Sequence, residues 1–243
     1  MTITDGTLGP RVRWAFADRT TGVSLPPYDA GNLADHVGDE PEHVAANRAT
    51  LAARVGVDGT HLVSMAPVHG NDVGSVDAPA TVPVAEVDAL VTRVPGLALL
   101  VVAADCVPVL LGDGDAGVVA VVHAGWRGVR SDVVGTTVES MVELGAAPDR
   151  IRAVVGPSIC GQCYDVPRER FDEVVAAAPS SASVARGGRP GLDLRAGVVT
   201  RLRELGIAST LHGGCTAEST SLFSFRRDPL TGRHGGVVTL VAR

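Results

Sequence analysis

The stretch LALLVVAADCVPVLLGDGDAGVVAVVHAGWRG, residues 97–128, decides the fold. Its parts 97–106 and 117–126 are nearly continuous apolar runs. Such runs are typical of central strands buried on both faces, because a strand with one solvated face alternates apolar and polar residues. A polar residue closes each run, first Cys106 and then His123. We therefore expect two buried strands that each deliver a chemically active side chain.

Strand-like and helix-like segments alternate along the rest of the chain, with Ser131 and Asp193 as plausible N-caps. The stretch 179–191, rich in Ser, Gly and Pro, is predicted to be a mobile surface loop. No repeat and no linker divides the chain, so we expect one α+β (mixed α/β) domain over 1–243, with mixed β-sheets flanked by helices. The expected strands are 12–17, 62–66, 151–156, 207–214 and 236–242, and the expected helices are 41–55, 131–144, 168–178 and 194–205.

The composition limits the classes of function. The 243 residues are 45% hydrophobic and 20% charged, which supports a large core. The net charge of −6 favours neither nucleic acid nor an anionic membrane as a partner, and no apolar run is long enough to span a bilayer. The N-terminus lacks the pattern of a signal peptide, so a cytoplasmic location is expected. We also expect a monomer. All 21 basic residues are arginine, which excludes a lysine Schiff base or a Walker-A loop and leaves arginine to hold anions.

Three potential metal ligands follow expected strands. His69 comes after the strand 62–66, and Cys106 and His123 close the two apolar runs. Because ligands gather at the carboxyl ends of strands in such sheets, these side chains could converge and leave an open fourth position, as in a catalytic zinc site. The alternative is that all three are satisfied core residues, since their spacing matches no local zinc signature.

Other residues have two interpretations each. Trp126 and Arg127 could stack an aromatic ring and hold an anion, or could pack in the core and lie in solvent. Cys160 and Cys163 form a CxxC pair that suggests a redox motif or half of a zinc site, but their context is a loop and no second CxxC exists. Cys215 is either a buried structural thiol or a second thiol of the pocket. His36 and His43 are expected to be solvated.

Eight blocks of sequence, taken together and in this order, resemble the YfiH/laccase-domain family. This family is also called the multicopper polyphenol oxidase family or peptidoglycan editing factor, and the resemblance runs from roughly residue 14 to the C-terminus. It implies a YfiH-like fold. The blocks are GVSLPPYDAGNLADHVGDEPEHVAANR (22–48), VHGNDV (68–73), VDALVT (87–92), ADCVPVLL (104–111), VVHAGWRG (121–128), GPSICGQCYDV (156–166), CTAESTSLFSFRRD (215–228) and TGRHGG (231–236).

The resemblance implies a zinc site formed by His69, Cys106 and His123. It implies phosphorolysis of adenosine, inosine, guanosine and methylthioadenosine, and deamination of adenosine to inosine. Copper is an alternative occupant, since Cu(II) binds such ligands more tightly than Zn(II). Phosphate then requires arginines, and Asn32 and Asp105 are candidate substrate contacts or supporting groups. The candidate arginines by motif position are Arg48, which we also place among the catalytic residues, Arg127, Arg226 and Arg227.

One departure and two other hypotheses stand beside this interpretation. Pro67 occupies the position before Val-His-Gly where the family usually has Gln, so any contact of that Gln is lost here. A peptidoglycan-precursor hydrolase could use Cys106 as nucleophile and His123 as base. A polyphenol oxidase would have to work with copper at one site, because seven histidines without a His-x-His pair cannot furnish a four-copper laccase.

Overall fold

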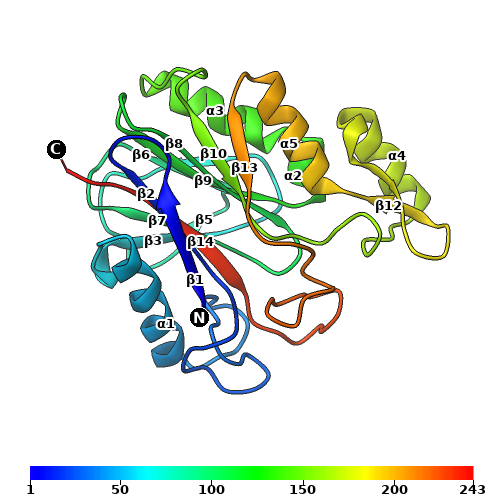
Figure 1. Cartoon of the computed structure of the whole chain (residues 1–243), viewed down its shortest axis with the longest axis horizontal. Coiled ribbons are helices and arrows are strands. Elements are labelled where there is room, and N and C mark those ends of the chain that lie inside the picture. Colours follow the sequence, from blue (N-terminus) through cyan, green and yellow to red (C-terminus); the bar gives the residue numbers. More distant parts are fainter. Residues whose placement is uncertain (243) are drawn as a thin grey trace.

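Two six-stranded mixed sheets face each other in the computed structural model, which describes residues 1–242 (Figure 1). The first sheet has the order β1 (Ile3–Thr7), β2 (Val12–Ala17), β14 (His234–Leu240), β7 (Ala98–Ala103), β3 (Leu62–Ala66) and β5 (Val84–Ala85). The second has the order β13 (Ala208–Leu211), β10 (Arg152–Val155), β8 (Val107–Asp113), β9 (Val118–Ala124), β6 (Ala89–Thr92) and β4 (Val73–Ser75).

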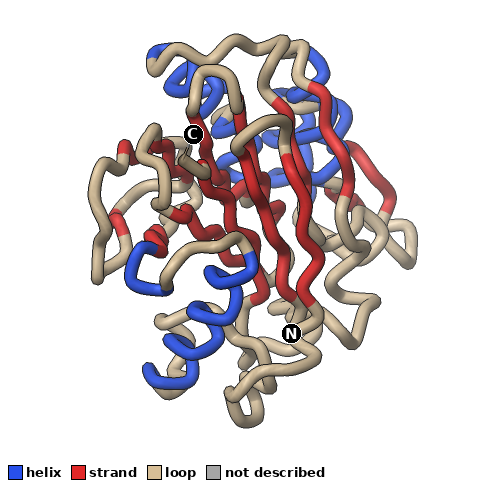
Figure 2. Tube along the Cα trace, turned by 60° about the vertical axis from the view of Figure 1, so that its left-hand side comes forward, coloured by secondary structure: helices blue, strands red, loops and turns tan. Residues whose placement is uncertain are grey.

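Helices cover the outer faces of both sheets, so the layers follow the order helix, sheet, sheet, helix. Figures 1 and 2 show α1 on the opposite side of the strands from the other helices. Within the described residues the helices are α1 (Pro41–Arg54), α2 (Trp126–Arg130), α3 (Val133–Glu143), α4 (Arg168–Ala177) and α5 (Leu194–Glu204), with short 3-10 turns η1 (Gly59–His61) and η2 (Pro179–Ser181).

The apolar side chains form three layers of core that match these faces. Leu99 of β7 and Val121 of β9 meet in the core between the sheets. Leu100 faces the other way, where α1 supplies Leu51, while Val122 faces the core under α3 and α5. Alternate residues of β7 and β9 thus serve two different cores, which explains why these strands read as continuous apolar runs.

The predicted α+β domain with mixed sheets is confirmed, and each expected strand and helix is present with ends shifted by at most a few residues. The expectation that 179–191 is a surface loop without regular secondary structure is wrong. That stretch contains η2 and the strand β11 (Ala182–Val184), which pairs with β12 (Pro190–Leu192) as an antiparallel ribbon. No helix within residues 1–242 is long and apolar enough to cross a membrane.

Two further local expectations need correction. Asp132, not Ser131, caps α3, since its carboxylate accepts a hydrogen bond from the Gly135 N–H at 3.1 Å. The Ser131 hydroxyl instead donates to the Arg127 carbonyl at the end of α2. The strand β8 was not expected. It contains Pro108, whose missing N–H argues against a central strand, although its carbonyl accepts a hydrogen bond from Gly156.

Candidate metal centre and substrate cavity

His69, Cys106 and His123 converge where the two sheets meet. Since β3 and β7 are parallel neighbours, the segments that follow them leave the same edge and carry His69 and Cys106. The turn after β7 enters β8 in the other sheet, where Pro108 pairs with His123 of β9. The candidate ligand atoms of these three side chains all lie within 4.8 Å of one another.

A buried carboxylate that the sequence analysis did not single out, Asp88, holds this cluster in place. Its oxygens accept hydrogen bonds from the backbone N–H groups of Val68, His69 and Gly70 at 3.1, 2.9 and 2.6 Å. Its Oδ1 also lies 2.9 Å from His123 Nδ1, and its carbonyl accepts from the His123 N–H. One side chain therefore orients both histidines, and Nε2 of His123 is left to face the cluster.

The backbone around the cluster is unusually constrained. His69 and Asp105 have φ values of 64° and 102°, in the region that favours glycine. Asp105 is secured through its carboxylate, which accepts hydrogen bonds from the Thr216 hydroxyl at 2.5 Å and from the Arg226 N–H at 2.7 Å. At Gly125, an added Cβ would lie 2.7 Å from Cδ2 of His69, so only glycine leaves room for that ring.

The cluster is strongly polarised. Burial alone would raise the pKa of Cys106, but the charge of His123 and hydrogen bonds from both histidines outweigh it and bring that pKa to about 6. Burial alone would lower the pKa of His123, but the Cys106 thiolate and Asp88 raise it to about 10. The metal-free protein therefore carries a thiolate next to an imidazolium, and the thiolate is the form that binds metals.

The donor set fits a metal ion. Two imidazole nitrogens and one thiolate leave a fourth position open, as in catalytic zinc sites, and copper accepts the same donors. The hydrogen bond from His123 Nδ1 to Asp88 is the carboxylate–histidine arrangement that commonly supports such ligands. Within residues 1–242 the only other group of three or more clustered ligand side chains is Cys160, Cys163 and Cys215.

A cavity of about 780 Å³ opens onto the three ligands. Its volume lies within the range of small-molecule sites. Apolar side chains that include Ile159 and Phe225 form part of its wall, and Phe225 remains 54% exposed. Asp105, Pro67 and four arginines also line it, so the cavity combines a candidate metal centre with four guanidinium groups. The four arginines are Arg127, Arg170, Arg226 and Arg233.

The candidate substrate residues divide into two groups. Arg127 and Arg226 line the cavity, whereas Asn32, Arg48 and Arg227 are not among its lining residues. Asn32 is fully buried and bonds to Asp39, to both backbone groups of Ala34 and to the Arg233 N–H. Arg48 binds the Leu33 carbonyl and Asp35, and Arg227 donates to the carbonyls of Thr216, Ser219 and Leu222.

Trp126 packs in the core and also supports the arginines. It contacts the core under the second sheet, and its ring lies 4.9 Å from the Arg127 guanidinium and 4.7 Å from that of Arg170. Arg170, Arg233 and Phe225 were missed at the sequence level. The last two lie in or beside quoted motifs, but Arg170 is one of several charges on a helix, and its sequence context gives no signal.

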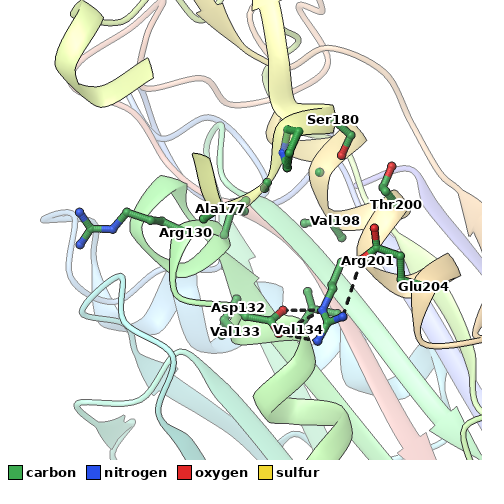
Figure 3. Close-up of a pocket in the computed structure, with 14 residues that line it drawn as sticks. Arg130, Asp132, Val133, Val134, Ala177, Ser180, Val198, Thr200, Arg201 and Glu204 are labelled. Atoms are coloured by element: carbon green, nitrogen blue, oxygen red, sulfur yellow. Dashed lines mark hydrogen bonds and ion pairs between the residues drawn. The ribbon is translucent and has the colours of Figure 1, made fainter. Parts of the chain in front are cut away.

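A second cavity, of about 390 Å³, lies between α2, α3 and α5 (Figure 3). Its main polar feature is Arg201, which forms ion pairs with Asp132 and Glu204. Its described lining residues include no histidine, no cysteine and no cluster of metal ligands. The larger cavity is therefore the candidate active site.

The family described as "Multi-copper polyphenol oxidoreductase laccase" matches residues 13–241. A purine nucleoside phosphorylase of Mycobacterium tuberculosis (strain ATCC 25618 / H37Rv) is 47% identical over 234 residues, covering 96% of this chain and 94% of that protein. One from Streptomyces griseus is 48% identical, covering 93% and 94%. The crystal structure of Bacillus licheniformis hypothetical protein YfiH superimposes with a TM-score of 0.87 at 29% identity, covering 94% and 92%. YlmD from Geobacillus stearothermophilus gives 0.87 at 28%, covering 98% and 94%.

Proposed function

The chain belongs to the multi-copper polyphenol oxidoreductase laccase family, and we propose that it is a zinc-dependent purine nucleoside phosphorylase that also deaminates adenosine. The observation that carries the proposal is the cavity, which joins a His–Cys–His cluster to four guanidinium groups. Relatives at 47% identity named purine nucleoside phosphorylase support it. The proposed substrates are adenosine, inosine, guanosine and methylthioadenosine with inorganic phosphate.

The arginines suit a phosphate. Arg127 and Arg170 stack on Trp126, and within residues 1–242 neither forms an ion pair with a carboxylate. Arg226 already shares its charge with Asp165. We therefore propose Arg127 and Arg170 as the principal phosphate ligands, with Arg226 setting the position of the neighbouring loop.

The apolar part of the wall suits a purine. Phe225 presents a half-exposed ring to the cavity, and Ile159 lines the same space. Aromatic faces stack on flat heterocycles, which fixes the ring plane without selecting among purines. Pro67 also lines the cavity and offers no hydrogen-bond donor, so this part of the wall discriminates weakly between an amino and a keto purine.

A Zn²⁺ bound by His69, Cys106 and His123 would supply Lewis acidity and would lower the pKa of a coordinated water toward about 7. The chain itself fixes the ligands through Asp88, holds the proton on His123 Nδ1 and surrounds the reacting centre with guanidinium charge. With the ion bound, this arrangement would suit the attack of water on C6 of adenosine with loss of ammonia, and the attack of phosphate on the anomeric carbon with departure of the purine.

The test supplies adenosine with and without phosphate and follows inosine, hypoxanthine, adenine and ribose 1-phosphate by chromatography. Ribose 1-phosphate should form only with phosphate, and inosine should form without it. Cys106→Ala should remove both activities together with the metal ion held by His69, Cys106 and His123. Absence of every product at micromolar enzyme would contradict the proposal, and an active Cys106→Ala variant would contradict the ligand assignment.

A second candidate, hydrolysis of a peptidoglycan precursor by a Cys–His pair, is favoured by the Cys106 thiolate beside His123. A chelator separates the two, since it stops the metal enzyme and leaves the thiol hydrolase active.

A four-copper laccase lacks ligands, because the two clusters within residues 1–242 contain two histidines between them. Copper at the single site, as a polyphenol oxidase, is tested by diphenol oxidation after copper loading.

A further inference from the structure

Three cysteines outside the first cluster come together between segments that also contribute residues to the cavity. Cys160 and Cys163 belong to one turn, and Cys215 comes from the segment after β13. Their sulfur atoms lie within 4.8 Å of one another. The sequence showed a CxxC pair without a second CxxC, but the fold brings a third thiol to it.

A fourth possible donor lies beside one of the three thiols. Cys163 Sγ is 3.7 Å from a carboxylate oxygen of Glu218. The spacing repeats, because Cys160-Gly-Gln-Cys163 is matched by Cys215-Thr-Ala-Glu218. In a tetrahedral zinc site, bonds of about 2.3 Å to sulfur and about 2.1 Å to oxygen separate neighbouring sulfur and oxygen ligands by roughly 3.6 Å and two sulfurs by roughly 3.8 Å. The three sulfur atoms thus need a contraction of at most about 1 Å to bind one ion, and Glu218 is the carboxylate that can approach from beside Cys163 as the fourth ligand.

The backbone already has the form of two linked ligand turns. The N–H groups of Cys163 and Tyr164 donate to the Cys160 carbonyl at 3.0 Å, which closes the first turn. The N–H of Ser219 donates to the Cys215 carbonyl, which closes the second. A bridge from Ser158 to Cys215 joins them. The Cys160 N–H also lies 3.3 Å from Cys215 Sγ, and an N–H aimed at sulfur favours its thiolate form.

A cation would relieve the crowding of these thiols. A divalent ion bound between the sulfur atoms would stabilise their thiolate forms and balance the negative charge that these bring. Arg186 forms an ion pair with Glu218 and would compensate part of the remaining negative charge.

We propose that Cys160, Cys163, Cys215 and Glu218 form a second zinc site with a structural role. Four protein ligands leave no open position, as in structural zinc sites. The site would join the segment that carries Ile159 and Tyr164 to the segment that carries Phe225 and Arg226, and all four of these residues line the cavity. Its presence does not depend on the reaction that the cavity performs.

The test is metal analysis of the full chain purified without chelator. The wild type should carry about two zinc ions per chain, Cys106→Ala about one, and Cys160→Ser/Cys215→Ser about one. Titration of Cys106→Ala with a thiol reagent should find its three remaining thiols protected until a chelator is added. Co²⁺ in this variant should give strong sulfur-to-cobalt absorption. Arg168→Ala, a change on an exposed ion pair, is the matched control and should keep both ions.

Three results would overturn the second site. One is a Cys106→Ala protein that is folded, free of zinc and reactive at all three thiols without chelator. Another is a Cys160→Ser/Cys215→Ser protein that keeps about two ions. The third is a mass two hydrogens lower that maps to a disulfide among these cysteines. Because Cys106→Ala is read by metal content and thiol protection, failure of the phosphorylase assay leaves this test intact.

Discussion

Asp88→Asn should weaken metal binding and destabilise the fold, because the carboxylate makes four hydrogen bonds that one amide cannot reproduce. Oδ1 accepts from the His69 N–H and from His123 Nδ1, and Oδ2 accepts from the Val68 and Gly70 N–H groups. Asparagine keeps one acceptor oxygen and replaces the other with an NH₂ donor. In either orientation of the amide, two of these four donors then face the NH₂ group, which cannot accept a hydrogen bond.

The magnitude follows from this count. Each hydrogen bond to a charged acceptor contributes about 1.5–3 kcal/mol, so the loss of two lowers the free energy of unfolding by about 3–6 kcal/mol. Because Asp88 also fixes the His123 ring, metal affinity should fall about 10–100-fold, as for other groups that orient a ligand. Urea unfolding of the metal-free protein measures the first quantity, and competition with a chromophoric chelator measures the second.

Asp113→Asn provides a matched control. Asp113 is also fully buried, and it accepts hydrogen bonds from the N–H groups of Asp115, Ala116 and Ala147. It ends β8, seven residues from Cys106, which is roughly 24 Å along an extended strand. This variant should lose comparable stability and keep its metal affinity. Equal metal affinity in Asp88→Asn, Asp113→Asn and the wild type would refute the role given to Asp88.

Further predictions concern the same site. Gly125→Ala should reduce metal affinity at least about tenfold, because its methyl displaces His69; Gly214→Ala, whose methyl meets no atom within 4 Å, should not. In metal-free protein that lacks the other three cysteines, the rate at which iodoacetamide alkylates Cys106 should fall below a midpoint near pH 6, because the thiolate is protonated there. A midpoint near pH 9 would contradict the ion pair with His123. Arg170→Ala should raise KM for phosphate about tenfold, which corresponds to about 1.4 kcal/mol, and should leave the free energy of unfolding unchanged. Arg227→Ala should instead lower stability, since three carbonyls lose their donor, and leave that KM within about twofold once folded.

Apolar patterning predicted the long central strands and four of the five helices within the described residues, and it missed β8 and the shorter strands. The runs at 97–106 and 117–126 give β7 and β9, since burial on both faces leaves no polar alternation. β8 was missed although all seven of its residues are buried. Pro108 marks it as a poor central strand by local rules, but its carbonyl accepts a hydrogen bond from the Gly156 N–H, and Pro108 pairs in register with His123 of β9. Tertiary pairing here overrides local propensity.

Strand ends and motifs predicted the three candidate metal ligands but not the directions of the side chains around them. Strand ends placed His69, Cys106 and His123 at one edge, and the structure brings them together. Motif membership could not say which way an arginine points, and the neighbours Arg226 and Arg227 go to the cavity and to loop carbonyls respectively. The three-cysteine cluster joins residues more than fifty positions apart, which no local spacing encodes.

The position of Cys106 explains why one stretch of sequence decides both fold and chemistry. Its turn is where the chain passes from the first sheet to the second. His69 arrives on the parallel neighbour of the strand before it, and His123 lies on the antiparallel neighbour of the strand after it. Asp88, just before β6, links both histidines. The ligand geometry therefore depends on how the two sheets pack. Substitutions in the core between β7 and β9 are expected to weaken metal binding even where the protein stays folded.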